Sequence, residues 1–338
     1  MAVFNANTQE TFDTTDSIRE DLTDIIYNIS PTETPFMMMV GRGSCESYKH
    51  EWQMDQLSAA ADNARHEGYT VAAISAVNAP IRVANYTQIS DKHISITGTM
   101  EAVNKAGRAS ELSYQLAKRA KELKRDMEWA MVGNTTPANM ASVAGASATA
   151  RRSAAVQAQF HASWVVGGSA LPGANISRGG GAGADGGYNT GTDLFVAPTD
   201  GTQRALTETL LKGVIQGAWT NGGDPTVIMC GPFNKTTISG FTGNSTRFDR
   251  GEDKRLVAAV DVYVSDFGEH RVVPNRFQRD RDVFALTPEL FKVCFLRPFR
   301  QHQLAKTGDS EERSLLAEWT LELNNNAGSG IVADLLTS

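Results

Sequence analysis

Residues 99–134 read TMEAVNKAGRASELSYQLAKRAKELKRDMEWAMVGN, and they predict one very long helix with a narrow apolar stripe. A helix of about thirty residues spans roughly 45 Å, which exceeds the diameter of a small domain. Most other positions of the stretch are charged or polar. The apolar residues recur at spacings of four and seven: Leu112, Leu116, Leu123, Met127 and Met131. This pattern indicates an elongated support along a thin body that packs against copies of itself, rather than the wall of a substrate pocket.

The residues before this helix predict a long β-hairpin. Tyr48, His50, Trp52 and Met54 alternate with polar residues, and a second alternating stretch runs from Ile81 to Ile96. Between the two stretches lie roughly twenty-five residues of Ala, Asn, Ser and Gly character, which predict a mobile tip. An isolated two-stranded hairpin is marginal in water and has open edges, so this element needs a neighbour.

The second strand of the hairpin changes its apolar face along its length. Apolar residues occupy odd positions as far as Ile89 and even positions from Ile94 onward. Because side chains alternate strictly between the two faces of a strand, such a change requires a bulge or a strong twist. We expect the bulge between Ser90 and His93.

The N-terminal residues predict an arm with one short helix. Residues 1–16 are polar and have no periodicity, which is typical of an extended segment without a core. A capping box formed by Ser17 and Glu20 then begins a helix that ends before Pro31. Its single apolar face carries Ile18, Leu22, Ile25 and Ile26. A narrow apolar face on an arm requires a partner surface.

The rest of the chain predicts a loose insertion, a compact α/β part and a strand-rich end. Residues 135–200 are rich in Gly, Ala and Ser and are expected to form loops. The compact part is expected to contain a helix over 202–219, strands over 227–230 and 256–264, and a helix from Pro232 between the strands. Alternation over 291–295 and 315–323 predicts two strands, and a turn over 324–330 precedes a last strand at Ile331.

Composition excludes several classes of protein. The chain has 338 residues and a formal net charge of −6, which argues against a protein that mainly grips nucleic-acid phosphates. Cys45, Cys230 and Cys294 are scattered and have no ligand-spaced partner, so we expect buried free thiols rather than a disulfide framework or a zinc site. The first residues lack the pattern of a signal peptide, and no apolar run is long enough to cross a membrane. The sequence therefore predicts a soluble protein made in a reducing cytoplasm.

No group of residues in the sequence predicts catalysis or a cofactor. The spacing of Gly181, Gly183 and Gly186 fits a dinucleotide-binding loop, but the flanking strand and helix are missing. His66 beside Glu67 could be an acid–base pair, although a solvated surface pair is far commoner. The basic residues of 118–125 and 151–152 could contact phosphate; acidic residues interleave with the first group, which favours a salt-bridged helix face.

Seven stretches of the chain resemble the major head proteins of tailed bacteriophages that have the Hong Kong 97 type of capsid fold. The stretches occur in the family's order and cover most of the chain: YNISPTETPFM (27–37), HEWQMDQL (50–57), NYTQISDK (85–92), EAVNKAGRASELSYQLAKRAKELKRDMEWAM (101–131), ATARRSAA (148–155), DGTQRALTETLLKGVIQGAW (200–219) and GPFNK (231–235). The long-helix segment is the most specific of them.

The resemblance implies an α+β fold of the Hong Kong 97 type. Its parts would be an N-terminal arm with a short helix (1–41), an extended-loop hairpin (42–98), the spine helix of a peripheral domain (99–134), an axial domain with a Gly-rich insertion (135–285), and the C-terminal strands of the peripheral domain (286–338). No long helical segment precedes the arm, so a scaffold is expected as a separate protein or a removed propeptide. The resemblance carries over no covalent cross-link, because no residue matches one.

The function that the resemblance implies is that of a major capsid protein rather than an enzyme. Many copies would assemble in the host cytoplasm, through hexamers and pentamers, into an icosahedral virion shell that packages double-stranded DNA. Implied partners are further copies of the chain, a scaffolding protein, a portal and a candidate decoration protein, with DNA near the inner surface, no sequence-specific binding and no membrane. No catalytic, cofactor or metal residues are implied.

Within that hypothesis, three groups of residues are expected to contact neighbouring subunits. They are Ile18, Leu22 and Ile25 on the arm, Trp52, Arg65, Glu67, Tyr69 and Arg82 on the hairpin, and Asn244, Arg247 and Arg250 in the polar loop 242–254 at the ring centre. Two alternatives remain open from the sequence. The same fold could form an encapsulin-like bacterial nanocompartment, or the chain could be a soluble oligomeric enzyme working at His66 and Glu67.

Overall fold

The computed structural model describes residues 30–57, 60–70, 80–133, 136–160, 165–166, 174–181, 184–241, 261–306 and 308–337. The expected arm helix with Ile18, Leu22 and Ile25 lies outside these ranges. So does the polar loop with Asn244, Arg247 and Arg250.

The described strands form four sheets. In the first, the order is β1 (Gly41–Ser44), β13 (Phe291–Gln303), β14 (Ser310–Leu323) and β4 (Gln88–Thr97). In the second, it is β10 (Val262–Ser265), β11 (Gly268–Pro274), β9 (Val227–Cys230), β12 (Val283–Leu286), β15 (Gly330–Val332) and β6 (Asn175–Ser177). The third pairs β2 (Lys49–Met54) with β3 (Ile81–Tyr86), and the fourth contains β5 (Val165–Val166), β7 (Gly187–Asn189) and β8 (Leu194–Val196).

The described helices are few and mostly short. They are α1 (Pro35–Met39), α2 (Gly98–Ala102), α3 (Glu111–Glu128), the π-helix η2 (Trp129–Gly133), the 3₁₀-helices η3 (Pro137–Met140) and η4 (Pro288–Leu290), α4 (Val156–Gln159), α5 (Glu208–Thr220) and α6 (Pro232–Ser239). No helix in the described part of the chain is long and apolar enough to cross a bilayer.

The expected single long helix is interrupted, so that prediction was wrong in its extent. Helix α2 ends at Ala102, and α3 begins only after Ser110, whose side-chain oxygen accepts a hydrogen bond from the backbone N–H of Ser113. Between them Gly107 has a φ of 74°, a left-handed conformation that Gly adopts without steric cost. Helix α3 has 18 residues and therefore spans about 27 Å.

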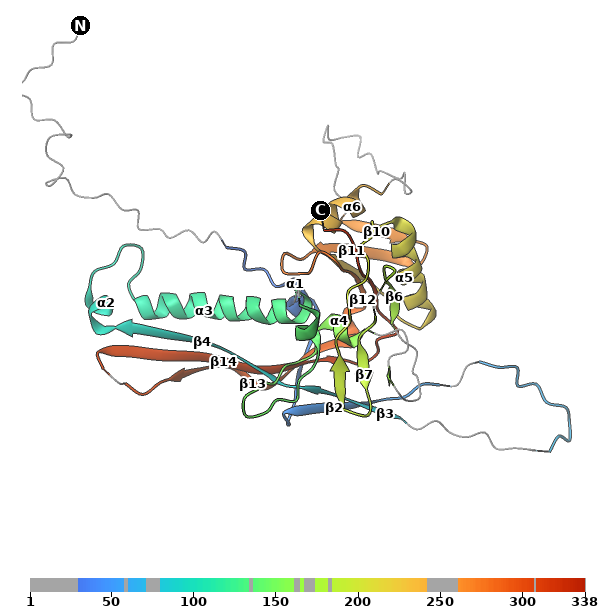
Figure 1. Cartoon of the computed structure of the whole chain (residues 1–338), viewed down its shortest axis with the longest axis horizontal. Coiled ribbons are helices and arrows are strands. Elements are labelled where there is room, and N and C mark those ends of the chain that lie inside the picture. The colour runs from blue at the N-terminus through green and yellow to red at the C-terminus, as the bar shows by residue number, and fades with distance from the viewer. Residues whose placement is uncertain are drawn as a thin grey trace, which may run out of the picture.

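Helix α3 nevertheless runs along the four-stranded sheet as an elongated support (Figure 1). Its buried residues Leu123 and Met127, with Met131 of η2, pack into a core that also holds Trp319 and Leu321 of β14. The apolar stripe predicted the buried face correctly. The same core continues to residues of β9, β12 and β15, so the two large sheets share one packed interior.

The expected bulge in the second hairpin strand is absent from its predicted place. Thr87 separates β3 from β4, and β4 pairs with β14 without a register shift from Gln88 to Thr97. The apolar face changes because β3 and β4 belong to different sheets. Register shifts occur instead between β13 and β14, at Phe295/Arg297 and Arg297/Arg300, next to Pro298, which has no N–H to donate to a ladder.

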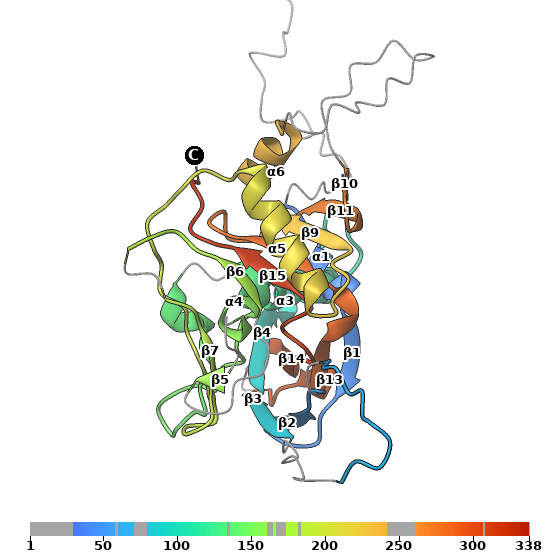
Figure 2. The same cartoon turned by 90° about the vertical axis from the view of Figure 1, so that its right-hand side faces the viewer.

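The compact α/β part is built on the six-stranded sheet, with α5 lying across it (Figure 2). Thr207 caps α5 by accepting from the N–H of Leu210, so the helix begins later than residue 202. Its apolar residues, including Leu211 and Ile215, pack against Ile228 of β9. The C-terminal strand β15 belongs to this sheet rather than to the four-stranded sheet with the other C-terminal strands.

The Gly-rich region is more structured than expected. It contributes β6 to the six-stranded sheet and β5, β7 and β8 to a small sheet of their own. Tyr188 and Phe195 from that small sheet are buried against Val83 and Ala84 of β3. This third core fixes the base of the β2–β3 hairpin on the body of the molecule.

Candidate assembly site

The β2–β3 hairpin is paired at its base and unsupported at its tip. Strands β2 and β3 are antiparallel, with Lys49 opposite Tyr86 and Met54 opposite Ile81. Beyond them, every described residue of 55–57 and 60–70 is exposed, including Leu57 with 96% of its surface open. In Figure 1 this tip extends away from the body of the molecule. A chain that presents an apolar residue on such an extension has a surface available to another subunit.

The residues expected to make contacts on the tip are close to one another but bury nothing. The Arg65 guanidinium lies 5.9 Å from the ring centre of Tyr69, and Glu67 is exposed beside them. Arg82 on β3 lies 3.8 Å from Glu51 and keeps 63% of its side chain exposed. No hydrogen bond or ion pair between His66 and Glu67 is found among the described residues, so an acid–base pair has no geometric support.

Trp52 lies at the base of the hairpin and is engaged by its own chain. Its indole N–H donates to the Leu323 carbonyl at 3.1 Å, and its ring stacks on Phe195 with centroids 6.5 Å apart. Lys49, at the start of the same strand, forms an ion pair with Asp193 at 2.8 Å, and this contact holds the pKa of Asp193 below its usual value. The base of the hairpin is therefore held by the Phe195 ring of β8, the Leu323 carbonyl of β14 and the Asp193 carboxylate of the β7–β8 turn.

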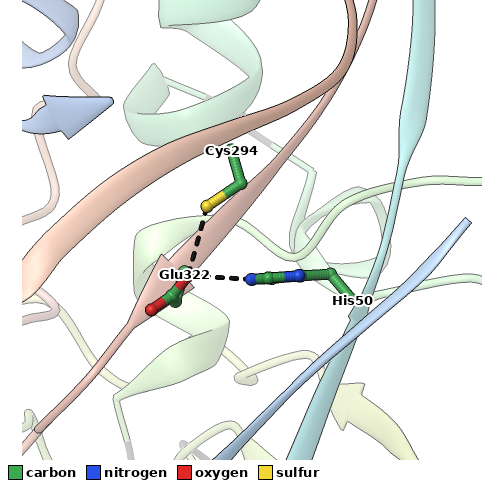
Figure 3. A group of neighbouring side chains, drawn as sticks. All are labelled: His50, Cys294 and Glu322. Carbon is green, nitrogen blue, oxygen red and sulfur yellow. Dashed lines mark hydrogen bonds and ion pairs between the residues drawn. The ribbon is translucent and has the colours of Figure 1, made fainter. Parts of the chain in front are cut away.

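Three further side chains meet at this base: His50 of β2, Cys294 of β13 and Glu322 of β14 (Figure 3). One carboxylate oxygen of Glu322, Oε2, lies 2.8 Å from His50 Nε2 and accepts from the Cys294 thiol at 3.1 Å. His50 holds the pKa of Glu322 below its usual value, whereas burial raises that of Cys294. The predicted buried cysteines without a disulfide are confirmed, since Cys45, Cys230 and Cys294 are all buried and unbridged.

Glu128, on the spine helix α3, connects this helix to α1 and to the loop after β11 of the six-stranded sheet. Its carboxylate accepts from the backbone N–H groups of Phe36 and Met37, at 2.8 and 2.9 Å, and from the Asn275 side chain at 2.7 Å. The residue is fully buried, and burial raises the pKa of its carboxyl group despite these three donors. Since α1, α3 and the loop after β11 meet here, this carboxylate fixes their relative positions.

Comparisons with known proteins identify the fold that this geometry builds. The model of the SU10 major capsid protein family matches residues 4–336. The chain belongs to this family. A curated major capsid protein of Escherichia phage Phieco32 is 25% identical over 326 residues, which cover 90% of each chain.

Solved capsids have the same fold at low sequence identity. A capsid subunit of Cyanophage A-1(L) superposes with a TM-score of 0.64 and 13% identity, covering 98% of this chain and 100% of that one. A subunit of the native GTA particle capsid gives 0.60 and 8%, covering 95% and 96%. The α+β fold of the Hong Kong 97 type is confirmed. The chain is a major capsid protein of the tailed-phage type, a structural component of the virion and not an enzyme.

In this capsid protein the charged face of the spine helix is only partly salt-bridged. Arg119 pairs with Glu122 at 2.7 Å, and Asp126 pairs with Lys92 of β4 at 2.5 Å. The exposed Lys118, Lys121 and Lys124 have no carboxylate partner among the described residues. The expected salt-bridged face is thus confirmed for some positions and wrong for these lysines.

A second buried carboxylate joins the middle of the four-stranded sheet to neighbouring segments. Glu318 accepts from Thr87 at 2.8 Å, from Arg151 at 2.6 Å and from Arg297 at 2.7 Å. Arg151, a candidate phosphate contact from the sequence, is therefore paired within the capsid protein. Sequence reasoning missed Glu128, Glu318 and Glu322, because each looks like an ordinary polar position on a helix or strand.

Proposed function

We propose that this capsid protein assembles through hexamers and pentamers into a closed icosahedral shell that packages double-stranded DNA. The observation that carries the proposal is the β2–β3 hairpin, whose described tip residues are all exposed and whose base is fixed by a core and by polar contacts. A hairpin whose base is fixed and whose tip is exposed can extend to a neighbouring subunit and bind it. Repeated heterologous contacts close into rings and shells when their rotation closes.

Each part of the subunit has its own role in the proposed shell. The hairpin within 42–98 lies over a neighbour, and the arm within 1–41 reaches another subunit. The spine within 99–134 and the C-terminal strands β13 and β14 form the wall, and the axial part within 135–285, whose sheet includes β15, closes the ring. A subunit held at several places gains through effective concentration what a single modest contact does not supply.

The proposed contacts of the hairpin come from charged and aromatic residues on its tip. Arg65, Glu67 and Tyr69 meet the neighbouring subunit, and Arg82 supports the contact nearer the body. Trp52 acts at the base, since its N–H and its ring already have partners in the same chain. Residues proposed for the other contacts are Ile18, Leu22 and Ile25 on the arm and Asn244, Arg247 and Arg250 at the ring centre.

The proposal includes partners beyond further copies of the chain. Assembly takes place in the cytoplasm of a bacterial host with a separate scaffolding protein, and a portal replaces subunits at one vertex. A decoration protein is a further candidate for the outer surface. DNA lies near the inner surface without sequence-specific binding, which agrees with a net charge of −6 on a chain that does not grip phosphates overall.

Deletion of residues 60–79 tests the role of the hairpin. The described residues in this range bury nothing, so the shortened chain should remain folded and soluble, with an unchanged circular dichroism spectrum and thermal midpoint. It should form no particles in negative-stain micrographs or in the void fraction of a size-exclusion column. A variant with Lys121→Ser, a change at an exposed position of α3, is the control and should assemble normally. Intact shells from the deletion would contradict the proposed contact.

A further inference from the structure

The cluster at the base of the hairpin brings together three kinds of metal ligand. An imidazole, a thiol and a carboxylate come from three different strands, and their ligand atoms all lie within 4.8 Å of one another. Cys294 is 1% exposed, and the His50 and Glu322 side chains are 17% and 11% exposed. The site is therefore nearly closed, and the histidine is its most exposed ligand. Imidazole, thiolate and carboxylate together suit zinc among the common biological metals.

The two distances from Glu322 Oε2 to the other ligand atoms are slightly shorter than those in a zinc shell. Zinc bonds of about 2.0–2.3 Å hold tetrahedral ligand atoms roughly 3.3–3.6 Å apart. The hydrogen-bonded distances are 2.8 Å from Glu322 Oε2 to His50 Nε2 and 3.1 Å from the same oxygen to Cys294 Sγ. Small side-chain rotations that separate the atoms by about half an ångström would admit the ion. Glu322 Oε2 therefore faces both His50 Nε2 and Cys294 Sγ.

The surroundings hold the ligands in the orientation that a metal site requires. The second oxygen of Glu322 lies 3.8 Å from Lys292 Nζ, and the Asn324 amide, oriented to satisfy both neighbours, donates to that oxygen at 2.6 Å. These contacts direct Oε2 toward the histidine and the thiol. Gly43 on β1 leaves the space that the Cys294 sulfur occupies, since a Cβ there would lie 2.7 Å from it. Outer contacts of this kind commonly orient metal ligands.

We propose that His50 Nε2, Cys294 Sγ and Glu322 Oε2 bind one zinc ion, with a water molecule as the fourth ligand. Binding forms three metal–protein bonds. The thiol proton leaves to solvent, and the proton that His50 Nε2 shares with Glu322 leaves as well, while the imidazole stays neutral with its proton on Nδ1, so no electron transfer is involved. One thiolate and one carboxylate balance the two charges of Zn²⁺, which makes the nearly buried site neutral overall. The ion would tie β2 of the hairpin to β13 and β14 of the four-stranded sheet.

Metal binding is measured on the unassembled full-length chain, so its outcome is independent of shell formation. The chain is stripped with a chelator, dialysed against Zn²⁺ and then against metal-free buffer, and its metal content is measured by mass spectrometry. We expect one zinc ion per chain. Substitution of Co²⁺ should give a thiolate-to-metal charge-transfer band together with visible bands of tetrahedral cobalt.

The three cysteines supply the variants that decide the outcome. Cys294→Ser should lose the charge-transfer band and the retained zinc, whereas Cys230→Ser, the matched change at a buried thiol on β9 of the other large sheet, should keep both. His50→Gln should weaken binding at least tenfold. Zinc content no higher than that of Cys294→Ser, or a band that persists in that variant, would overturn the site and leave a purely hydrogen-bonded cluster. X-ray absorption at the zinc edge is the check that needs no variant: one sulfur ligand is expected, and a shell of only nitrogen and oxygen would refute the site.

Discussion

Replacement of Glu128 tests whether a buried carboxylate holds three parts of the tile together. Removing the side chain in Glu128→Ala leaves two backbone N–H groups, of Phe36 and Met37, and the Asn275 amide without an acceptor. An unsatisfied buried donor costs about 1–3 kcal/mol, and these costs are not additive. We therefore expect Glu128→Ala to lower the free energy of unfolding by about 3–5 kcal/mol.

Glu128→Gln separates the hydrogen bonds from the charge. The glutamine amide keeps one acceptor oxygen, but its NH₂ group cannot accept a hydrogen bond and faces at least one N–H donor. This loss should lower the free energy of unfolding by about 1–2 kcal/mol. It also removes the charge that burial disfavours. The pKa of Glu128 is raised in the folded chain by burial, so folding favours its protonated form. The stability from this group is therefore greatest below the unfolded pKa and is lost as the pH rises through the folded pKa.

The assay is urea unfolding of the unassembled chain from about pH 2.5 to about pH 8, a range that extends well below the ordinary glutamate pKa as well as above it. The difference in stability between wild type and Glu128→Gln should fall as the pH rises. Glu111 on the same helix is the control, because its hydrogen bond from Gln115 lowers the pKa of its carboxyl group. The matching difference for Glu111→Gln should show the opposite trend and be lost as the pH falls. A flat profile for Glu128→Gln, or a Glu128→Ala chain within about 0.5 kcal/mol of wild type, would refute the reasoning.

Two further predictions concern the polar contacts of the four-stranded sheet. In Gly43→Ala the new methyl group would lie 2.7 Å from the Cys294 sulfur, so the thiol must turn away from Glu322. Urea unfolding should show that the free energy of unfolding falls by about 1–2 kcal/mol. Adding Cys294→Ala to the same chain should restore most of this stability. Failure of the double variant to recover would place the strain elsewhere. Glu318→Gln leaves Arg151 and Arg297 without their shared charge and should cost about 3 kcal/mol, measured the same way. Arg297→Gln should cost less, because the Arg297 side chain is 42% exposed, and equal costs would contradict this account.

The elements predicted correctly are those with a strong local pattern. Period-two alternation found β14 and the pairing of 48–54 with 81–86, and a short apolar run found β9 at its observed residues, 227–230. The break at 103–110 had local signals as well, since Gly107 and the capping residue Ser110 both precede a regular stripe. Gly107 lies in this break and Ser110 begins the second helix, so the charged stretch is not one continuous helix. The α+β fold itself came from the resemblance, which the family match confirms.

The candidate site could not be predicted in the same way, because its contacts are made between distant positions. His50 and Glu322 are 272 positions apart, and Glu128 meets Phe36 at a separation of 92. Nothing in the local pattern distinguishes Glu322, on the solvent-side alternation of β14, from Glu312 on the same strand. Burial decides which carboxylate becomes a junction, and burial depends on how the sheets pack. The expected assignment of β15 to the peripheral sheet was wrong for the same reason.

The distribution of polar and apolar contacts explains how a thin tile keeps its shape. One apolar core joins the two large sheets, and buried carboxylates are added where separate elements meet: Glu128 where α1 meets α3, Glu318 where β14 meets the segment around Arg151, and Glu322 where the hairpin meets the sheet. Apolar contacts are non-directional, whereas a hydrogen bond weakens steeply away from its preferred angle. A carboxylate with two or three donors from different elements therefore fixes their relative orientation as well as their distance. In a closed shell an angular error in one subunit is repeated at every copy, so directional contacts where its elements meet limit that error.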